Sequence, residues 1–388
     1  MNPQPDWRAS LTSSTRYDNI QAIKDILEQA GLPPTDAHKD AFSIESEAYK
    51  ASASREHYEA ACQIKPRPTS PAPLKRVEEV HGLPDVSDGS GITIGSYRDC
   101  QHIGEGVTAE VYRSKTVALK VIVQTRNIEP HDPFREAKIL RLLKKPCIPL
   151  LETFRDADQR FVLAFPYMQF SLEALIARGP IHRSRIINHF RDLFTALQYL
   201  HSQGIIHRDI KPSALLLETP DGPAYLSDFG TAWHPELSIY TEPADQKILD
   251  IGTGPYRSPE ALFGNKSYGT AVDMWAAGTM LAESCRTPPR TLFQSRPAYE
   301  DGNQLGLILS IFKTIGSPTR ESWPEAVAFK TPPFDMYQAF EGQKWEELLS
   351  DVKVEFRDIV VSLVRYSSGA RASASQVLQH QCFSSASP

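Results

Sequence analysis

The chain has 388 residues, of which 41% are hydrophobic and 23% are charged, as is usual for a globular protein. Its formal net charge of -5 argues against a general nucleic-acid binder, which would usually be basic, so no direct nucleic-acid partner is expected. No apolar run approaches the roughly 18 residues of a membrane-spanning helix, so no membrane partner is expected. The five cysteines contain no C-x-x-C pair and are interpreted as reduced thiols of an intracellular protein. The first residues, MNPQPDWRAS, show no apolar signal core, which leaves the nucleus and the cytoplasm as expected locations.

Residues 66–96 are rich in proline, serine and glycine and are interpreted as an extended linker, because proline lacks a backbone donor and disfavours helix. The segment before it, residues 1–65, is expected to form three short amphipathic helices around one small core. Apolar side chains recur at helical spacing in its first two stretches, and Ser54 is suited to cap the third helix. The apolar positions are Ile20, Ile23, Ile26 and Leu27, then Ala37, Ala41, Ile44 and Ala48, then Tyr58, Ala61 and Cys62.

A glycine-rich stretch follows at residues 101–112, QHIGEGVTAEVY. Gly104 and Gly106 carry no Cβ, so this backbone can approach phosphate groups closely. The run TVALK comes next and ends on Lys120, whose ammonium group can reach phosphate oxygens, with Glu136 as its partner on a helix. Either string taken alone also fits an ordinary turn or a lysine at the end of a strand.

The strongest single signal is IIHRDIKPSALLL at residues 205–217. Asp209 can accept the proton of a substrate hydroxyl, and Lys211 can neutralise charge on a transferred phosphoryl group. Asp228, in the D-F-G tripeptide after AYLS, would hold Mg²⁺ against the phosphates. Three supporting contacts are expected: Thr253 with Asp209 and Lys211, Asp273 with backbone N–H groups of the catalytic loop, and Glu260 with Arg371.

In this order, these elements resemble the eukaryotic protein kinase family over about residues 97–383. The resemblance implies an α+β fold with a β-rich N-terminal lobe and a helical C-terminal lobe, and ATP with Mg²⁺ as cofactors. It also implies a hinge in RFVLAFPYMQF, with Phe165 as the gatekeeper. The residues expected to contact the nucleotide are Ile103, Gly104, Gly106, Val111, Ala118, Lys120, Glu136, Met168 and Leu216; the catalytic residues are Asp209, Lys211 and Thr253, and the metal ligand is Asp228.

Within that family the chain resembles the cyclin-dependent-kinase branch and, more closely, the fungal single-subunit kinases that activate cyclin-dependent kinases. The resemblance lies in GPAYLSDF, IGTGPYRSPEALFG and VDMW, and in an insertion-like stretch at residues 301–325. It implies that the protein substrate is a cyclin-dependent kinase, phosphorylated on its activation-loop threonine. No cyclin partner is expected, because Gly254-Pro255 replaces the usual Leu-Trp and the helix around Glu136 lacks a PSTAIRE-like sequence.

The front segment resembles the KIX-type domain at the head of fungal Mediator tail subunits, in DWRASLTSSTRYDNIQAIKDILEQ and IESEAYKASASREHY. This resemblance covers about Asp6 to Lys65 and implies a three-helix bundle whose groove takes amphipathic activator peptides. An unspecialised helical extension is the alternative.

Two positions depart from the kinase pattern. Ala214 stands where the family has asparagine, so the second Mg²⁺ site should be weakened. Ile248 stands at the usual phosphothreonine position; Glu242, Asp245 and Asp250 are the acids that could order the loop instead, and Tyr240 and Thr241 are the alternative sites of modification. An active serine/threonine kinase is the first interpretation. A pseudokinase scaffold and a transcription-linked adaptor with a passenger kinase fold are the alternatives.

Overall fold

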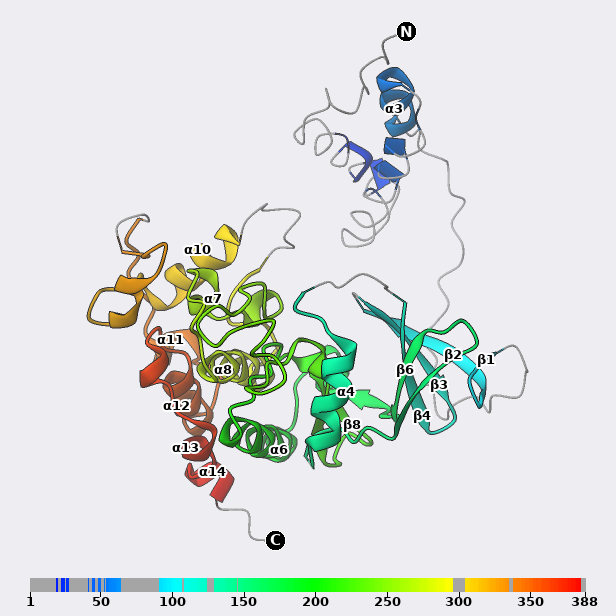
Figure 1. Ribbon diagram of the computed structural model, residues 1–388. Helices are drawn as coiled ribbons and strands as arrows, with labels where there is room; N and C mark the ends of the chain where they lie inside the picture. Colours follow the sequence, from blue (N-terminus) through cyan, green and yellow to red (C-terminus); the bar gives the residue numbers. More distant parts are fainter. Residues whose placement is uncertain are drawn as a thin grey trace, which may run out of the picture. The chain divides into compact units, whose positions relative to one another are not determined.

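The computed structural model describes residues 91–384 with gaps at 107, 124–128, 145, 296–303 and 335–337, and earlier in the chain residues 54–63 and positions 19, 22–24, 26–27, 41, 44–45, 48–49 and 52. The chain divides into two compact units, Met1–Val86 and Ser87–Pro388, which are both drawn in Figure 1. Most of the stretch predicted as a linker, residues 66–90, lies outside the described residues.

The first unit contains a small apolar cluster. The described residues of all three predicted helical stretches are helical, whereas Ile20 and Ala37 lie outside the described residues. Helix α3, Arg55–Cys62, begins as predicted after Ser54, whose side-chain oxygen accepts a hydrogen bond from the His57 backbone at 3.2 Å. The buried members of the cluster come from all three stretches and are Ile23, Ala41, Ala48, Tyr58 and Cys62.

The second unit begins with a six-stranded antiparallel sheet in the order β1-β2-β3-β4-β6-β5. Because side chains alternate along a strand, Leu119 and Val121 are buried in the core on one face while Ala118 and Lys120 project from the other. The strands are β1 (Ile92–Ile94), β2 (Tyr97–Glu105), β3 (Ala109–Ser114), β4 (Val117–Ile122), β5 (Glu152–Arg155) and β6 (Phe161–Pro166).

The sheet begins earlier than the sequence predicts. Ile92 pairs with Cys100 and Ile94 pairs with Tyr97, so β1 lies inside the stretch assigned to the linker, and the predicted linker end at residue 96 is wrong. The physical reason is burial: Ile94 is 1% exposed and packs with Cys100 in the core of the sheet. Three residues are too short for composition to distinguish a strand from a linker.

Helix α4, Pro133–Leu142, carries Glu136 to the sheet. Asp132 caps its start by accepting hydrogen bonds from the backbone of Phe134 at 3.0 Å and of Arg135 at 2.9 Å. Pro133 at the first helical position needs no hydrogen-bond donor there. The cap and the proline together define where the helix begins, and Glu136 lies one turn beyond it on the buried face.

The rest of the second unit is mainly helical, as predicted, and forms one large core (Figure 1). Its centre is α8, which is buried along almost its whole length. A small sheet of β7 (Phe170–Ser171), β8 (Leu215–Leu217) and β9 (Ala224–Leu226) lies beside the catalytic loop. The helices are α5 (Leu172–Ala177), α6 (Arg183–Ser202), α7 (Pro259–Leu262), α8 (Ala271–Cys285), α10 (Leu305–Ile315), α11 (Trp345–Leu348), α12 (Val354–Leu363), α13 (Ala374–Leu378) and α14 (Gln381–Ser384).

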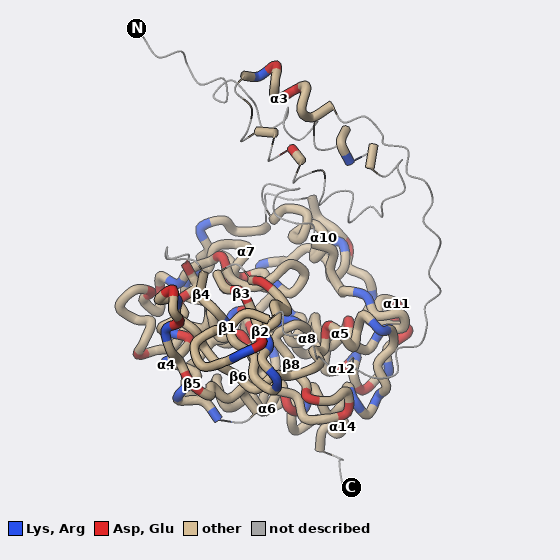
Figure 2. Tube along the Cα trace, turned by 90° about the vertical axis from the view of Figure 1, so that its right-hand side faces the viewer, with Lys and Arg blue, Asp and Glu red and all other residues tan. Residues whose placement is uncertain are grey.

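The charged residues of the second unit are of mixed sign. Figure 2 shows lysine and arginine interspersed with aspartate and glutamate over the elements in view. No helix within the described ranges is both long enough and apolar enough to cross a membrane.

Two features hold α8 in place. Glu260, in the short α7, forms the predicted buried ion pair with Arg371, with 2.7 Å between Oε2 and Nη2. Gly278 faces α12 so closely that an added Cβ would lie 2.7 Å from Cβ of Leu363 and 3.1 Å from Cγ2 of Val364. Since Leu363 Cβ is fixed by its own backbone, this approach admits no larger residue without movement of the helices.

Replacing Gly278 by alanine is therefore expected to lower the free energy of unfolding. Alanine gains about 1 kcal/mol of helix propensity, but overpacking costs about 1–3 kcal/mol, so the net loss should be on the order of 1 kcal/mol. Thermal unfolding of G278A measures this. The control is G369A, where an added Cβ meets nothing within 4 Å. Equal or higher melting temperatures for G278A than for G369A would contradict the close packing.

Candidate active site

A cavity of about 530 Å³ separates the sheet from the helical lobe, a volume suited to a small-molecule ligand. All nine residues predicted to contact a nucleotide line it, and so do the predicted gatekeeper Phe165 and the predicted metal ligand Asp228. An added Cβ at Gly104 would meet no protein atom within 4 Å, so packing within the protein does not require glycine there. The nine residues are Ile103, Gly104, Gly106, Val111, Ala118, Lys120, Glu136, Met168 and Leu216.

Lys120 on β4 is joined to Glu136 on α4 at the back of this cavity. Lys120 Nζ lies 2.8 Å and 2.9 Å from the two Glu136 oxygens and 3.3 Å from Asp228 Oδ1. Burial lowers the pKa of Lys120, but the carboxylates of Glu136 and Asp228 outweigh it and raise the pKa above its ordinary value. The lysine is thus held as a cation that points along the cleft.

Asp209 and Lys211, which lie two residues apart in one loop, meet Thr253 from a later segment of the chain. Lys211 Nζ donates to Asp209 Oδ2 at 2.6 Å, and Thr253 Oγ1 donates to Asp209 Oδ1 at 2.6 Å. Lys211 Nζ also lies 3.4 Å from Thr253 Oγ1, which completes the predicted three-way contact. Burial lowers the pKa of Lys211, but the carboxylates of Asp209 and Asp228 together have the larger effect and raise the pKa above its ordinary value. The ammonium group therefore stays charged. Both oxygens of Asp209 are therefore fixed in direction.

Asp273 on α8 anchors this loop, as predicted. Its carboxylate accepts backbone hydrogen bonds from His207 at 2.9 Å and from Arg208 at 2.8 Å, and a third from His201 Nε2 at 2.9 Å. Burial raises the pKa of Asp273, but the hydrogen bond from His201 and the charges nearby lower it below its ordinary value. A buried carboxylate that stays ionised is thus the fixed point from which the catalytic loop is held.

The D-F-G segment places Asp228 in the cleft. Asp228 has a left-handed backbone, with φ of 63°, and Phe229 is fully buried with its ring centroid 4.8 Å from that of His207. Burial raises the pKa of Asp228, but Lys120 and Lys211 lower it well below its usual range. Asp228 is therefore an ionised oxygen donor facing the nucleotide cavity.

The residues present fit one divalent metal better than two. Asp228 supplies ionised oxygens, whereas Ala214 has no side-chain oxygen. The carbonyl of Ala214 already accepts two hydrogen bonds from Ser227, one from the backbone N–H at 2.8 Å and one from the hydroxyl at 2.9 Å. Ser213 lines the cavity beside it. No group of three histidine, cysteine, aspartate or glutamate side chains suited to a metal ion occurs within the described ranges. A second ion would depend on phosphate and water oxygens.

Sequence reasoning missed one residue of the site. His131 lines a neighbouring cavity of about 340 Å³ together with Asp209, Lys211, Asp228 and Thr253. Burial lowers the pKa of His131, with an opposing effect of Asp228. Its position one residue before the α4 cap, Asp132, was the only available signal, and nothing in the sequence shows that this turn faces the cleft.

Comparison with known proteins agrees with this geometry. Residues 97–383 match the protein kinase domain family. Three similar proteins are serine/threonine-protein kinase csk1 of Schizosaccharomyces pombe, 33% identical over 72% of this chain and 92% of that protein; cyclin-dependent kinase D-1 of Arabidopsis thaliana, 30% identical over 73% and 70%; and cyclin-dependent kinase 7 of Xenopus laevis, 32% identical over 74% and 81%.

The assembled lysine–glutamate pair, the oriented catalytic aspartate and these similarities lead to one conclusion. The chain belongs to the protein kinase family and is a serine/threonine kinase, for which the family implies ATP, a divalent metal and protein substrates.

Proposed function

We propose that the protein phosphorylates the activation-loop threonine of a cyclin-dependent kinase, using ATP and Mg²⁺, and that it does so as a single subunit. One observation carries the proposal: the Lys120–Glu136 pair and the Asp209–Lys211–Thr253 group are both formed within this one chain. In protein kinases the lysine–glutamate pair and the D-F-G aspartate must both be in place for transfer. In this chain Lys120 on β4 and Glu136 on α4 are paired, with 2.8 Å and 2.9 Å between Nζ and the two carboxylate oxygens.

The proposed reaction follows from the geometry. Asp209 accepts the proton of the substrate hydroxyl and aims that oxygen at the γ-phosphorus of ATP. Lys211 neutralises the charge that develops on the transferred group, and Lys120 binds the phosphates that stay behind. Asp228 would hold the divalent metal, which would supply further positive charge to the phosphates. The new bond forms between the substrate oxygen and phosphorus, and ADP leaves with the electrons of the broken bond.

Glu242 supports activity without phosphorylation of the loop. It is 2% exposed, and its Oε1 accepts from Arg208 Nη1 and from the backbone of Ile248 at 2.8 Å. Its own carbonyl accepts from Trp233 Nε1 at 2.9 Å. Arg208 directly precedes Asp209, so this buried carboxylate connects the activation segment, residues 228–260, to the catalytic loop, residues 205–217. It does so at Ile248, where the kinase pattern has a phosphothreonine.

The other two acids considered at this loop lie differently. Asp250 is exposed and pairs with Arg257, 2.9 Å between Oδ1 and Nη2. Asp245 is exposed and forms no ion pair with any residue that the structure describes. Of the three candidates, Glu242 is thus the one placed to order the loop from within.

Replacing Glu242 by glutamine should strongly reduce the turnover number. Removing one partner of a buried ion pair costs about 3–5 kcal/mol of stability, so the contact that holds Arg208 should be weakened. We expect the turnover number to fall at least about tenfold, which corresponds to about 1.4 kcal/mol of activation free energy. Initial rates of E242Q and wild type, both treated with phosphatase, measure the effect. The control is E236Q, an exposed acid of the same segment, which should stay within about twofold of wild type. Equal rates for E242Q and wild type, or loss of wild-type activity after phosphatase, would refute this role.

The identity of the substrate rests on resemblance. Two of the similar proteins bear the name cyclin-dependent kinase, and the activation segment carries the sequence typical of single-subunit activating kinases. The test is transfer from radiolabelled ATP to a purified cyclin-dependent kinase with no cyclin present. K120M is the inactive control, because methionine keeps the stem of the side chain without its charge.

A substrate whose activation-loop threonine is changed to alanine gives the matched control. Label should enter the unmodified substrate and not this variant. Transfer that appears only after cyclin is added would refute the single-subunit proposal. Equal labelling of both substrates would refute the proposed target residue.

Ala214→Asn should raise activity at limiting Mg²⁺. An asparagine oxygen at this position would complete the second metal site, since Mg²⁺ prefers near-octahedral oxygen coordination. The measurement is initial rate against Mg²⁺ concentration. Ala214→Leu adds similar bulk without an oxygen, and it is the control for crowding at a residue only 1% exposed. Coincident curves for wild type and A214N at high activity would mean that the missing ligand is irrelevant. Inactivity of both would favour the pseudokinase alternative.

We also propose that residues 1–65 form a docking module for amphipathic acidic peptides, as their KIX-like sequence suggests. The apolar cluster that draws on all three stretches supports a small helical core. A fluorescent acidic helical peptide should bind the full chain more tightly than a chain that starts after residue 65. Equal affinities for the two proteins would refute the docking role.

A further inference from the structure

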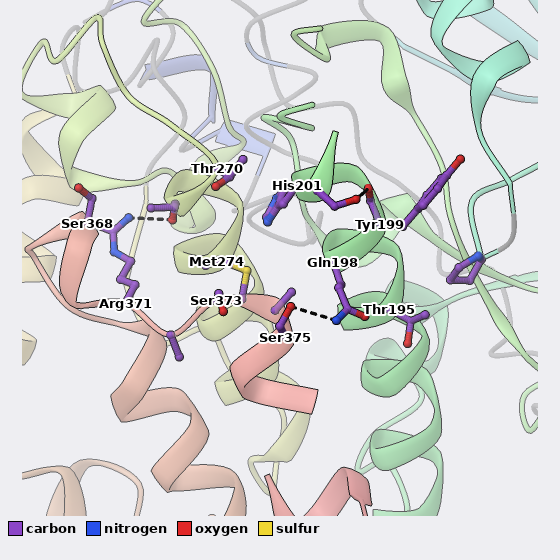
Figure 3. Close-up of a pocket in the computed structure, with 15 residues that line it drawn as sticks. Thr195, Gln198, Tyr199, His201, Thr270, Met274, Ser368, Arg371, Ser373 and Ser375 are labelled. Atoms are coloured by element: carbon purple, nitrogen blue, oxygen red, sulfur yellow. Dashed lines mark hydrogen bonds between the residues drawn. The ribbon is translucent and has the colours of Figure 1, made fainter. Parts of the chain in front are cut away.

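A second large cavity lies in the helical lobe, separate from the nucleotide cleft. It has a volume of about 780 Å³ and is bounded by α6, by the start of α8 and by the segment 368–375 (Figure 3). None of its lining residues lines the nucleotide cavity or the cavity beside His131. Its volume falls in the range of small-molecule sites. The proposed transfer reaction gives this cavity no role.

Three residues of α6 that line this cavity carry hydroxyl groups. Thr195 Oγ1 donates its proton to the Arg191 carbonyl at 2.7 Å, and Ser202 Oγ donates to the Tyr199 carbonyl at 2.7 Å. Tyr199 Oη in turn donates to the Leu142 carbonyl at 3.3 Å. A hydroxyl has one proton and two lone pairs, so each of these three groups is left as an acceptor.

His201 adds a fourth hydrogen-bonding group. Its Nε2 lies 2.9 Å from Asp273 Oδ2, and since an ionised carboxylate only accepts, Nε2 must carry a proton. The other nitrogen, Nδ1, accepts in the neutral imidazole and donates in the charged one, and a hydroxyl group can partner either form. Nδ1 makes no hydrogen bond to any part of the chain that the structure describes. Figure 3 shows His201 in the wall of the cavity beside Thr270.

The cavity wall offers no free carboxylate or guanidinium. None of its lining residues, all of which the structure describes, is aspartate or glutamate, and Arg371 is the one that is always charged. The Arg371 guanidinium is already occupied by Glu260 at 2.7 Å and by the carbonyls of Ala271 at 2.8 Å and Arg365 at 2.8 Å. An anion would find no unoccupied guanidinium there, and a cation would find no carboxylate.

Apolar groups complete the wall. Met274 and Ala271 from the start of α8, Pro146, and the ring of Tyr199 lie among the polar groups. A guest must therefore combine several hydrogen-bond donors with C–H surface and carry no net charge. Polyols and sugars have this combination, because hydroxyl groups and C–H groups alternate around their rings.

We propose that this cavity binds a neutral polyhydroxylated small molecule, a cyclic polyol or a sugar of one or two rings. Its hydroxyl groups form hydrogen bonds with the hydroxyl oxygens of Thr195, Tyr199 and Ser202 and with Nδ1 of His201. Its C–H faces pack against Met274 and the Tyr199 ring.

The test uses the full chain with labelled histidine rings and two neutral probes, myo-inositol and trehalose. At least one probe should shift the ring resonances of His201 saturably in nuclear magnetic resonance titrations. Thr195→Trp places an indole in the cavity and should weaken binding at least about tenfold, which corresponds to roughly 1.4 kcal/mol. Asn188→Trp is the matched control on α6, two turns earlier and outside the cavity, and should leave the affinity unchanged.

Charged probes test the chemical class. Inositol hexakisphosphate and spermidine should produce no saturable shift of His201. The proposal is overturned if neither neutral probe shifts His201, if a charged probe does so in their place, or if Thr195→Trp binds as tightly as Asn188→Trp. Should Thr195→Trp fail to fold, Ser375→Trp closes the opposite wall, at an exposed side chain that accepts from Gln198 Nε2 at 3.0 Å, and the same outcomes apply.

Discussion

The buried charge of Arg208 is the constraint on which the active site depends. Its side chain is fully buried, and a guanidinium in that environment must be matched by charge and hydrogen bonds. Its backbone N–H is held by Asp273 on α8, and its side chain is held by Glu242 of the activation segment and, at 3.1 Å, by the Tyr268 hydroxyl. The residue next in the chain is Asp209. One buried cation thus ties the central helix, the catalytic loop and the activation segment together.

The charged side chains in the cleft form a second network of ion pairs. Asp228 lies between two lysines, 3.3 Å from Lys120 and 3.9 Å from Lys211. Lys120 is paired with Glu136, and Lys211 is paired with Asp209. These ion pairs limit how far either lysine can move toward Asp228. Cations and a carboxylate are therefore fixed before any nucleotide arrives, and this preorganisation reduces the rearrangement needed during transfer.

Asp273, which holds the catalytic loop, also contacts the wall of the cavity in the helical lobe. Asp273 accepts a hydrogen bond from His201, which lines that cavity, and two from the catalytic loop. Arg371, in the same wall, pairs with Glu260 at the end of the activation segment. The buried carboxylate of Asp273 thus connects the cavity wall to the catalytic loop, and that of Glu260 connects it to the end of the activation segment.

The sequence by itself determined which groups meet in the cleft: Asp209 with Lys211, Asp228, the Lys120–Glu136 pair and the predicted residues that line the cavity. These could be predicted because short motifs keep reactive groups at fixed separations along the chain, and local backbone geometry follows from those separations. Only the tertiary structure decided which of three acids meets Arg208, because Glu242 and Arg208 are 34 residues apart. The same holds for His131 facing the cleft, for β1 joining the sheet and for the cavity beside His201. Each of these depends on burial and on contacts between distant segments, for which neither spacing nor composition carries a signal.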